Sequence, residues 1–219
     1  MRCVVASDYS VHVTASAQPV EPGASDPRGD AARERILAAT IENLSENGFN
    51  GISLSTIARR AGFTRSGLLH HFGTKEALLR EALGHRLLTN ARALHSIETA
   101  TANEMLDAVV RMVEFALWVS NASRAYQIIA AEATAPDHPA HTWFAGQFAQ
   151  VRENMAGAIR RSIERGEARP DADIDAITLQ LVAMSDGLQL HWLHDESLDA
   201  VGAARYVVEL IRADIAPRA

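Results

Sequence analysis

The segment 64–72, TRSGLLHHF, gathers side chains that can do chemistry. It holds one arginine, two hydroxyl residues and two adjacent histidines, and it contains no carboxylate. Such a set suits either a metal-binding or catalytic histidine pair, or a helix face that contacts a negatively charged partner. The residues on both sides of the segment decide between these two interpretations.

Two short helices with a tight turn between them are predicted around this segment. Ser53 is a good N-cap for a helix that ends at Ala61, and Thr64 caps the next one. Gly62 lies between them and supplies the backbone freedom that a tight turn needs. Apolar side chains fall where two crossed helices must meet: Ile57, Ala58, Ala61, Phe63, Leu68 and Phe72. This pattern predicts a helix-turn-helix, whose second helix lies in the major groove of DNA.

The second helix would present its polar side to DNA while Leu68 and Phe72 face inward. Arg65 can make a bidentate contact with guanine, and Leu69 can meet a thymine methyl group. Hydroxyl groups, histidines and free N–H groups at helix starts can bind phosphate, as can Lys75, the only lysine of the chain. We therefore predict that DNA is contacted by Ser53, Ser55, Thr64, Arg65, Ser66, Gly67, Leu69, His70, His71 and Lys75.

The charge distribution also points to a polyanion. The whole chain has a net charge of −6, yet within residues 28–92 the basic residues outnumber the acidic ones by four. A basic block on an acidic body predicts a negatively charged partner for that block alone.

The continuous stretch 33–83 closely resembles the DNA-binding domain of the TetR (tetracycline repressor-like) family. The resemblance rests on the Ile-Leu of the first helix, the Glu-Asn-Gly-Phe turn, Ile-Ala-x-x-Ala-Gly, and Lys-Glu-Ala-Leu after the recognition helix. It implies an all-helical homodimer that binds a pseudo-palindromic operator and, in most members, a repressor that a small molecule releases from DNA. The segment MSDGLQLHWLHDESLD further resembles the BetI-like C-terminal domain of one subgroup.

The chain departs from the family pattern at three positions. Leu69 and Gly73 stand where the family usually has Tyr and commonly has Pro, and His71 stands where Tyr or His is frequent. Without the tyrosine hydroxyl, one phosphate contact that the family implies is lost at Leu69. His71 has an alternative role, which is packing against the first helix.

The periodicity of apolar residues predicts an all-α chain of about nine helices. We expect a disordered arm at 1–27, a helix-turn-helix domain at 28–75 and an effector-binding and dimerisation domain at 76–219. The expected helices span approximately 31–47, 53–61, 64–72, 75–94, 102–120, 122–135, 139–166, 173–194 and 197–214.

The helices after residue 100 carry the candidate effector pocket and dimer interface. A chamber lined by apolar side chains with a few polar groups is typical of ligand sites. Its candidate lining is Met112, Phe115, Trp118, Tyr126, Trp143, Phe144, Gln147, Phe148, Gln180 and Met184, for which ordinary core packing is the alternative. The last two helices are strongly amphipathic, so pairing with a second subunit is predicted through Leu181, Leu188, Trp192, Tyr206, Val207 and Leu210.

Several other functions are not expected. The chain shows no grouping typical of an enzyme, and we predict no cofactor and no metal site. His138 and His141 are three positions apart, but zinc needs further ligands, so we interpret them as surface or helix-end histidines. No apolar run is long enough to span a membrane or form the core of a secretory signal, which favours a cytoplasmic protein. The partners expected are double-stranded DNA, a small-molecule effector of unknown identity and a second copy of the chain. The main alternative is an effector-independent DNA-binding regulator or activator.

Overall fold

The computed structural model describes residues 27–84 and 100–218, and within these ranges the chain is all-helical. The predicted arm at 1–27 therefore lies almost wholly outside the described residues, as does the second half of the helix predicted at 75–94. Residues 75–84 are helical. The other helices are α1 (Pro27–Gly51), α2 (Leu54–Ala61), α3 (Arg65–Phe72), α5 (Ala102–Trp118), α6 (Ser120–Glu132), α7 (His141–Glu164), α8 (Ile174–His194) and α9 (Ala200–Ile215).

Helix α1 is kinked close to the point where the sequence predicts its end. Gly48 has φ 62° and ψ −174°, outside the helical region, and a short helical stretch follows it as far as Gly51. A positive φ of this size is easily adopted only by glycine. The kink turns the chain toward α2 and leaves the start of α2 to be capped by Ser53.

Side-chain caps at helix starts confirm several predicted boundaries. The hydroxyl of Thr64 accepts a hydrogen bond from the Gly67 amide at 3.0 Å, and that of Thr74 accepts one from Ala77 at 3.0 Å. Helix α5 starts with a full capping box, in which Thr101 and Glu104 each accept from the other's backbone amide. These local bonds satisfy amides that the helix itself leaves unpaired.

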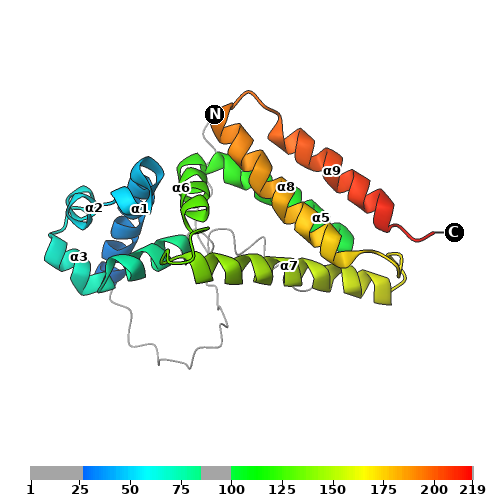
Figure 1. The fold of residues 1–219 in the computed structure, drawn as a ribbon, viewed down its shortest axis with the longest axis horizontal. Coiled ribbons are helices and arrows are strands. Elements are labelled where there is room, and N and C mark those ends of the chain that lie inside the picture. Colours follow the sequence, from blue (N-terminus) through cyan, green and yellow to red (C-terminus); the bar gives the residue numbers. More distant parts are fainter. Residues whose placement is uncertain (1–26, 85–99, 219) are drawn as a thin grey trace.

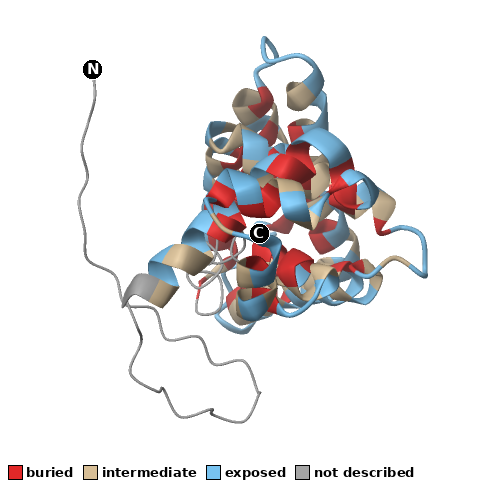
Figure 2. Ribbon diagram, turned by 90° about the vertical axis from the view of Figure 1, so that its left-hand side faces the viewer, coloured by how far each residue is buried: buried red, intermediate tan, exposed pale blue. Residues whose placement is uncertain are grey.

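Two hydrophobic cores hold the molecule together. The first unites α1, α2, α3 and residues 78–83 with Ala125, Ile129 and Ala133 of α6 and its C-terminal end, and with Ala140 and Phe144 at the start of α7. The second lies among α5, α7, α8 and α9. Helix α6 therefore stands between a head, made of α1–α3 and residues 75–84, and a body of long helices (Figure 1). Residues buried in these cores face one another between the helices, and the outer faces are exposed (Figure 2).

Helices α8 and α9 lie side by side, and α8 also packs against α7, whereas α9 lies on the side of the body away from α7 (Figure 1). Their start points are fixed by Asp173 and Asp199, whose carboxylates accept hydrogen bonds from Ala176 and Gly202. Among the described residues, no helix is long and apolar enough to cross a lipid bilayer.

Candidate nucleic-acid interface

The turn between α2 and α3 has the geometry that the sequence predicts. Gly62 adopts φ 79° and ψ 32°, and the amide of Phe63 reaches back to the carbonyl of Ala58 at 2.8 Å. A β-carbon at Gly62 would displace the guanidinium of Arg35, and the positive φ itself favours glycine at this position. Helix α3 consequently leaves α2 through a short, fully bonded connection.

Two arginines of α1 anchor this pair of helices. Arg35 donates a hydrogen bond to the Ala61 carbonyl at the end of α2 (2.6 Å) and lies 5.2 Å from the centre of the Phe63 ring. Arg33 donates to the His71 carbonyl near the end of α3 (2.9 Å). Its guanidinium also lies over the Phe72 ring and forms an ion pair with Glu81. Cations bonded to the last carbonyls of a helix also complement its dipole. Sequence reasoning assigned both arginines to the basic block without this anchoring role.

The recognition helix buries the predicted side and exposes the other. Leu68 is fully buried and Phe72 nearly so, whereas Arg65, Ser66 and His70 are exposed. The exposed set continues along the caps and α2 through Ser53, Ser55 and Thr64. Gly67 and Leu69 are partly buried, and Leu69 packs against the first core. These residues belong to α2, α3 and their N-caps, and both helices lie at the end of the molecule opposite α9 (Figure 1).

Two predicted contact residues have neighbours of their own. The ring of His71 is partly buried and meets the Phe63 ring edge-on, with 6.0 Å between ring centres. The ammonium of Lys75 lies 4.2 Å from the centre of the Phe49 ring, in a cation–π arrangement. Both groups sit beside the exposed set.

The basic block contains arginines that pair with carboxylates of the same subunit and arginines that do not. Arg60 pairs with Glu46 at 2.7 Å, and this hydrogen bond lowers the pKa of Glu46 from its ordinary value. Arg59, Arg65 and Arg80 are exposed and have no ion-pair or hydrogen-bond partner within the described ranges 27–84 and 100–218. Arg59 was missed by sequence reasoning, although its position two residues before the end of α2 was a usable signal.

The candidate effector-site residues separate into a cluster and two outliers. Tyr126, Trp143 and Phe148 surround Phe144, each with ring centres 4.9–5.9 Å from it. Met112 and Met184 pack against the second core, while Phe115 and Gln147 are partly buried. Trp118 is 81 % exposed because it ends α5 on the solvent side, and Gln180 is exposed because the helical step rotates it away from its buried neighbour Leu181. Neither side chain is buried in the single subunit, and their place in the ligand chamber stays a prediction.

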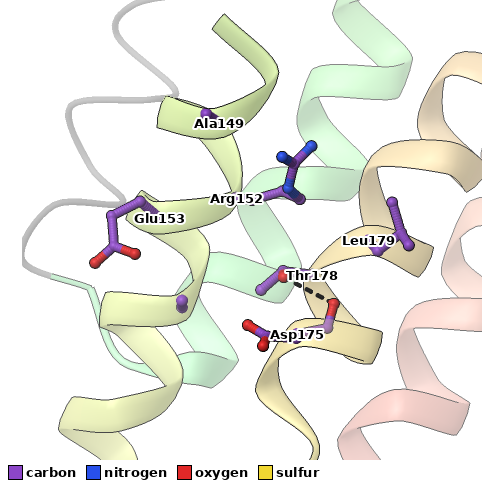
Figure 3. A pocket seen from close by; sticks show the side chains of 7 residues that line it. Ala149, Arg152, Glu153, Asp175, Thr178 and Leu179 are labelled. Atoms are coloured by element: carbon purple, nitrogen blue, oxygen red, sulfur yellow. Dashed lines mark hydrogen bonds between the residues drawn. The ribbon is translucent and has the colours of Figure 1, made fainter. Parts of the chain in front are cut away.

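A pocket of ≈ 470 Å³ lies between α7 and α8, and none of the predicted effector-site residues lines it. Its wall combines Arg152 with two carboxylates and small side chains (Figure 3). Glu153 in this wall is already paired with Arg160 at 3.0 Å, and the Thr178 hydroxyl donates to the Asp175 carbonyl at 3.2 Å. The guanidinium of Arg152 and the carboxylate of Asp175 have no hydrogen-bond or ion-pair partner among the described residues.

The predicted dimer residues are only partly on the surface. Leu181 is fully buried in the second core, so its assignment to the subunit interface is wrong. Val207 packs partly against the same core, and Leu188 and Trp192 are partly buried. Tyr206 and Leu210 are 68 % and 54 % exposed, and Leu179 and Leu190, which sequence reasoning missed, join them as exposed apolar side chains of α8.

Comparison with known families gives matches over both parts of the chain. Residues 36–82 match the family described as "Bacterial regulatory proteins, tetR family". Residues 104–216, slightly more than half of the chain, match the family described as "BetI-type transcriptional repressor, C-terminal".

Individual relatives and solved structures agree with these matches. The chain is 25 % identical over 203 residues to the transcriptional regulator BetI of Burkholderia mallei, covering 85 % of this chain and 94 % of that protein. It is 25 % identical over 156 residues to the transcriptional repressor AcnR of Corynebacterium efficiens, covering 71 % and 79 %. A TetR transcriptional regulator from Chloroflexus aurantiacus shares the fold with a TM-score of 0.76 at 18 % identity, covering 87 % of this chain and 99 % of that one. FadR of Bacillus subtilis, solved with stearoyl-CoA, gives 0.70 at 23 %, covering 83 % and 98 %.

Proposed function

This chain belongs to the TetR family of bacterial transcriptional regulators and carries a BetI-type repressor C-terminal domain, and we propose that it is a cytoplasmic, homodimeric repressor released from its operator by a small molecule. The observation that carries the DNA-binding part is the recognition helix. Its apolar side is buried in the head, and its other side exposes Arg65, Ser66 and His70. A helix held in this way can enter the major groove with its N-terminal residues at the base edges.

The exposed apolar face of α8 and α9 supports the dimer. Leu179 and Leu190 of α8 and Tyr206 and Leu210 of α9 are each about half exposed or more. The same face of a second subunit would cover them and form a four-helix contact with two-fold symmetry. Two recognition helices would then lie about 34–36 Å apart, as a pseudo-palindromic operator requires.

The aromatic cluster around Phe144 supports the effector-binding part of the proposal. It joins α6 to the start of α7, so a ligand inserted among these rings would press on the helix that also borders the head. FadR of B. subtilis was solved with stearoyl-CoA, and SmeT, another structural neighbour, was solved with triclosan. A ligand can change DNA affinity only through its different affinities for the two shapes of the dimer.

A gel-shift titration tests the proposal. The purified protein, at low ionic strength, is incubated with duplex fragments covering the DNA on both sides of its own gene. We expect at least one fragment to be retarded, with affinity falling steeply as salt rises, because phosphate contacts release counterions. Retardation of no fragment would remove the basis of the proposed function.

A further inference from the structure

The head packs against α6 and the start of α7 through the first core, and one carboxylate adds a polar contact at the kink of α1. The backbone amide of Phe49 donates a hydrogen bond to Oε2 of Glu132 at 2.8 Å, and Glu132 is the last residue of α6. In a continuous helix this amide would bond to the carbonyl four residues earlier. The kink at Gly48 releases it, and Glu132 takes the place of that carbonyl.

The carboxylate is seated against the glycine as well as the amide. A β-carbon at Gly48 would collide with Oε1 of Glu132 and would lie 3.3 Å from Ile128. Gly48 is thus required by its positive φ, whereas the contact with Oε1 is to the end of a flexible side chain that can move. Oε2 is therefore held by the Phe49 amide, and Oε1 lies against Gly48.

A second donor lies close to the same oxygen but does not reach it. The His138 side chain is 6 % exposed, and its Nε2 is 3.8 Å from Oε2 of Glu132. Nδ1 of His138 accepts a hydrogen bond from the Ala140 amide at 3.2 Å, so in the neutral ring Nε2 carries the proton. Nε2 is buried and has no hydrogen-bond partner in the described structure. A buried donor without an acceptor is unfavourable, which drives it toward any acceptor that becomes free.

We infer that Glu132 is an acceptor shared between the head and the body, and that the choice of donor sets the position of the head. In the state described, the Phe49 amide holds the carboxylate and the His138 Nε2–H is unsatisfied. When the head moves away from α6, His138 closes the remaining gap and takes over the carboxylate. The free-energy cost of breaking the bond between Glu132 and the Phe49 amide is thereby reduced. The contact between α1 and α6 then has two discrete arrangements.

Phe49 connects this exchange to the DNA-binding surface. The Phe49 ring meets the His138 ring edge-on, with 5.1 Å between ring centres and an interplanar angle of 76°. It also makes the cation–π contact with the ammonium of Lys75. A movement of Phe49 would therefore change the contact made by the side chain that we propose to bind phosphate. This link to DNA rests on the proposed function, whereas the exchange of donors does not.

Amide hydrogen exchange at Phe49 tests the exchange of donors directly, without DNA. The chain has six phenylalanines, so selective ¹⁵N-Phe labelling of the full chain gives one reporting amide and five internal references. Three variants are compared with the wild type. Glu132→Ala removes the acceptor, Glu132→Gln keeps a carbonyl acceptor, and His138→Asn keeps an acceptor for the Ala140 amide but is too short to reach Glu132.

We expect Glu132→Ala to accelerate exchange at Phe49 by about tenfold or more while the reference amides change little, because only the local bond is lost. Glu132→Gln should restore most of the protection. His138→Asn should slow exchange at Phe49 by roughly two- to fivefold, because the competing donor is gone. Unchanged exchange in Glu132→Ala, an equal rise at all six amides, or faster exchange in His138→Asn would each overturn the inference.

DNA titrations then test the consequence for head position. Because two heads held at a fixed spacing bind two half-sites with a high effective concentration, Glu132→Ala should lose about tenfold in affinity for the full operator. Its affinity for a duplex with one half-site should stay at the wild-type value. Equal losses on both duplexes would contradict a positioning role for Glu132. Failure of the wild-type protein to bind any duplex would instead contradict the proposed function, and the exchange measurement would still decide the inference.

Discussion

At the scale of single residues, the arginines of the head fall into two groups with different tasks. Arg33 and Arg35 bond to the last carbonyls of α3 and α2 and so keep the two helices at a fixed angle. Arg59 and Arg65 face outward without a partner in the described residues. Some arginines of the head therefore hold its helices together, and others lie on the surface that we propose to contact DNA.

The outward position of Arg65 leads to a specific prediction. Arg65→Ala should weaken binding to the operator by ~1–3 kcal/mol and relax the choice of base at one position of each half-site, because a guanidinium at the helix start can read guanine. Binding is measured by titration against the operator and against a set of single-base variants. Arg205→Ala, at an exposed arginine of α9, is the control and should bind as the wild type does. An equal loss on operator and random DNA would show that Arg65 contacts phosphate only.

Lys75 gives a second prediction of a different kind. If its ammonium leaves the Phe49 ring to meet a phosphate, Lys75→Ala should weaken binding to every DNA sequence alike. The slope of log affinity against log salt concentration should become shallower by about one unit, the contribution of one phosphate contact. Lys75→Arg keeps the charge and should retain the slope. A slope that is the same in Lys75→Ala and the wild type would assign Lys75 to the Phe49 contact alone.

At the scale of elements, the helices and their ends were predictable because short-range signals determine them. Ser53, Thr64 and Asp173 cap helices at the predicted positions, and Gly62 makes the predicted turn. The outward face of α8 was not predictable in the same way. Unlike α9, that helix is not strongly amphipathic, contrary to the expectation from its sequence. Its periodicity therefore does not tell which leucines face the core, and Leu181 was placed on the wrong side.

Contacts between distant segments were beyond sequence reasoning for another reason. His138 was interpreted as a surface or helix-end histidine, but its side chain is buried against Phe49, almost ninety residues earlier. The bond between Glu132 and the Phe49 amide depends on a kink, a neighbouring helix and a turn that come together only in the folded chain. The candidate DNA surface was easier, because it lies within a single stretch of local structure.

The capping box of α5 provides a prediction about stability and pH. The hydrogen bonds that Glu104 accepts from the Thr101 amide and hydroxyl lower the pKa of Glu104. A carboxylate with a lowered pKa stabilises the folded state above its ordinary pKa, and this contribution is lost as pH falls through the lowered value. The wild type should therefore melt above Glu104→Gln at neutral pH, and the difference in Tm should vanish in acid.

Thr101→Ala removes the other half of the box. It should lower the free energy of unfolding by about 1 kcal/mol, the usual cost of losing an N-cap hydroxyl. Denaturant unfolding followed by circular dichroism measures this change. An unchanged midpoint would show that the first turn of α5 is held by core packing alone.

At the scale of the whole molecule, the apolar face of α8 and α9 is the feature that a single subunit leaves unexplained. Leu210→Glu should weaken subunit association by at least about tenfold, or 1.4 kcal/mol, because a carboxylate would be buried in an apolar contact. Sedimentation equilibrium at micromolar concentration measures it. Ala145→Glu adds the same charge at an exposed position of α7 and should remain associated. A wild-type protein that sediments as a monomer would refute the assignment of this face.

The first core also limits how freely this protein can be recombined. Side chains of α6 and of the start of α7 pack against the helices of the head. A head truncated after residue 75 would therefore leave its core exposed where Ile129 and Phe144 pack. An engineer who grafts the operator preference of this chain onto the sensor of a relative should therefore move α6 together with the head. A chimera joined directly after residue 75 should aggregate or bind DNA weakly, even if every base-reading side chain is retained.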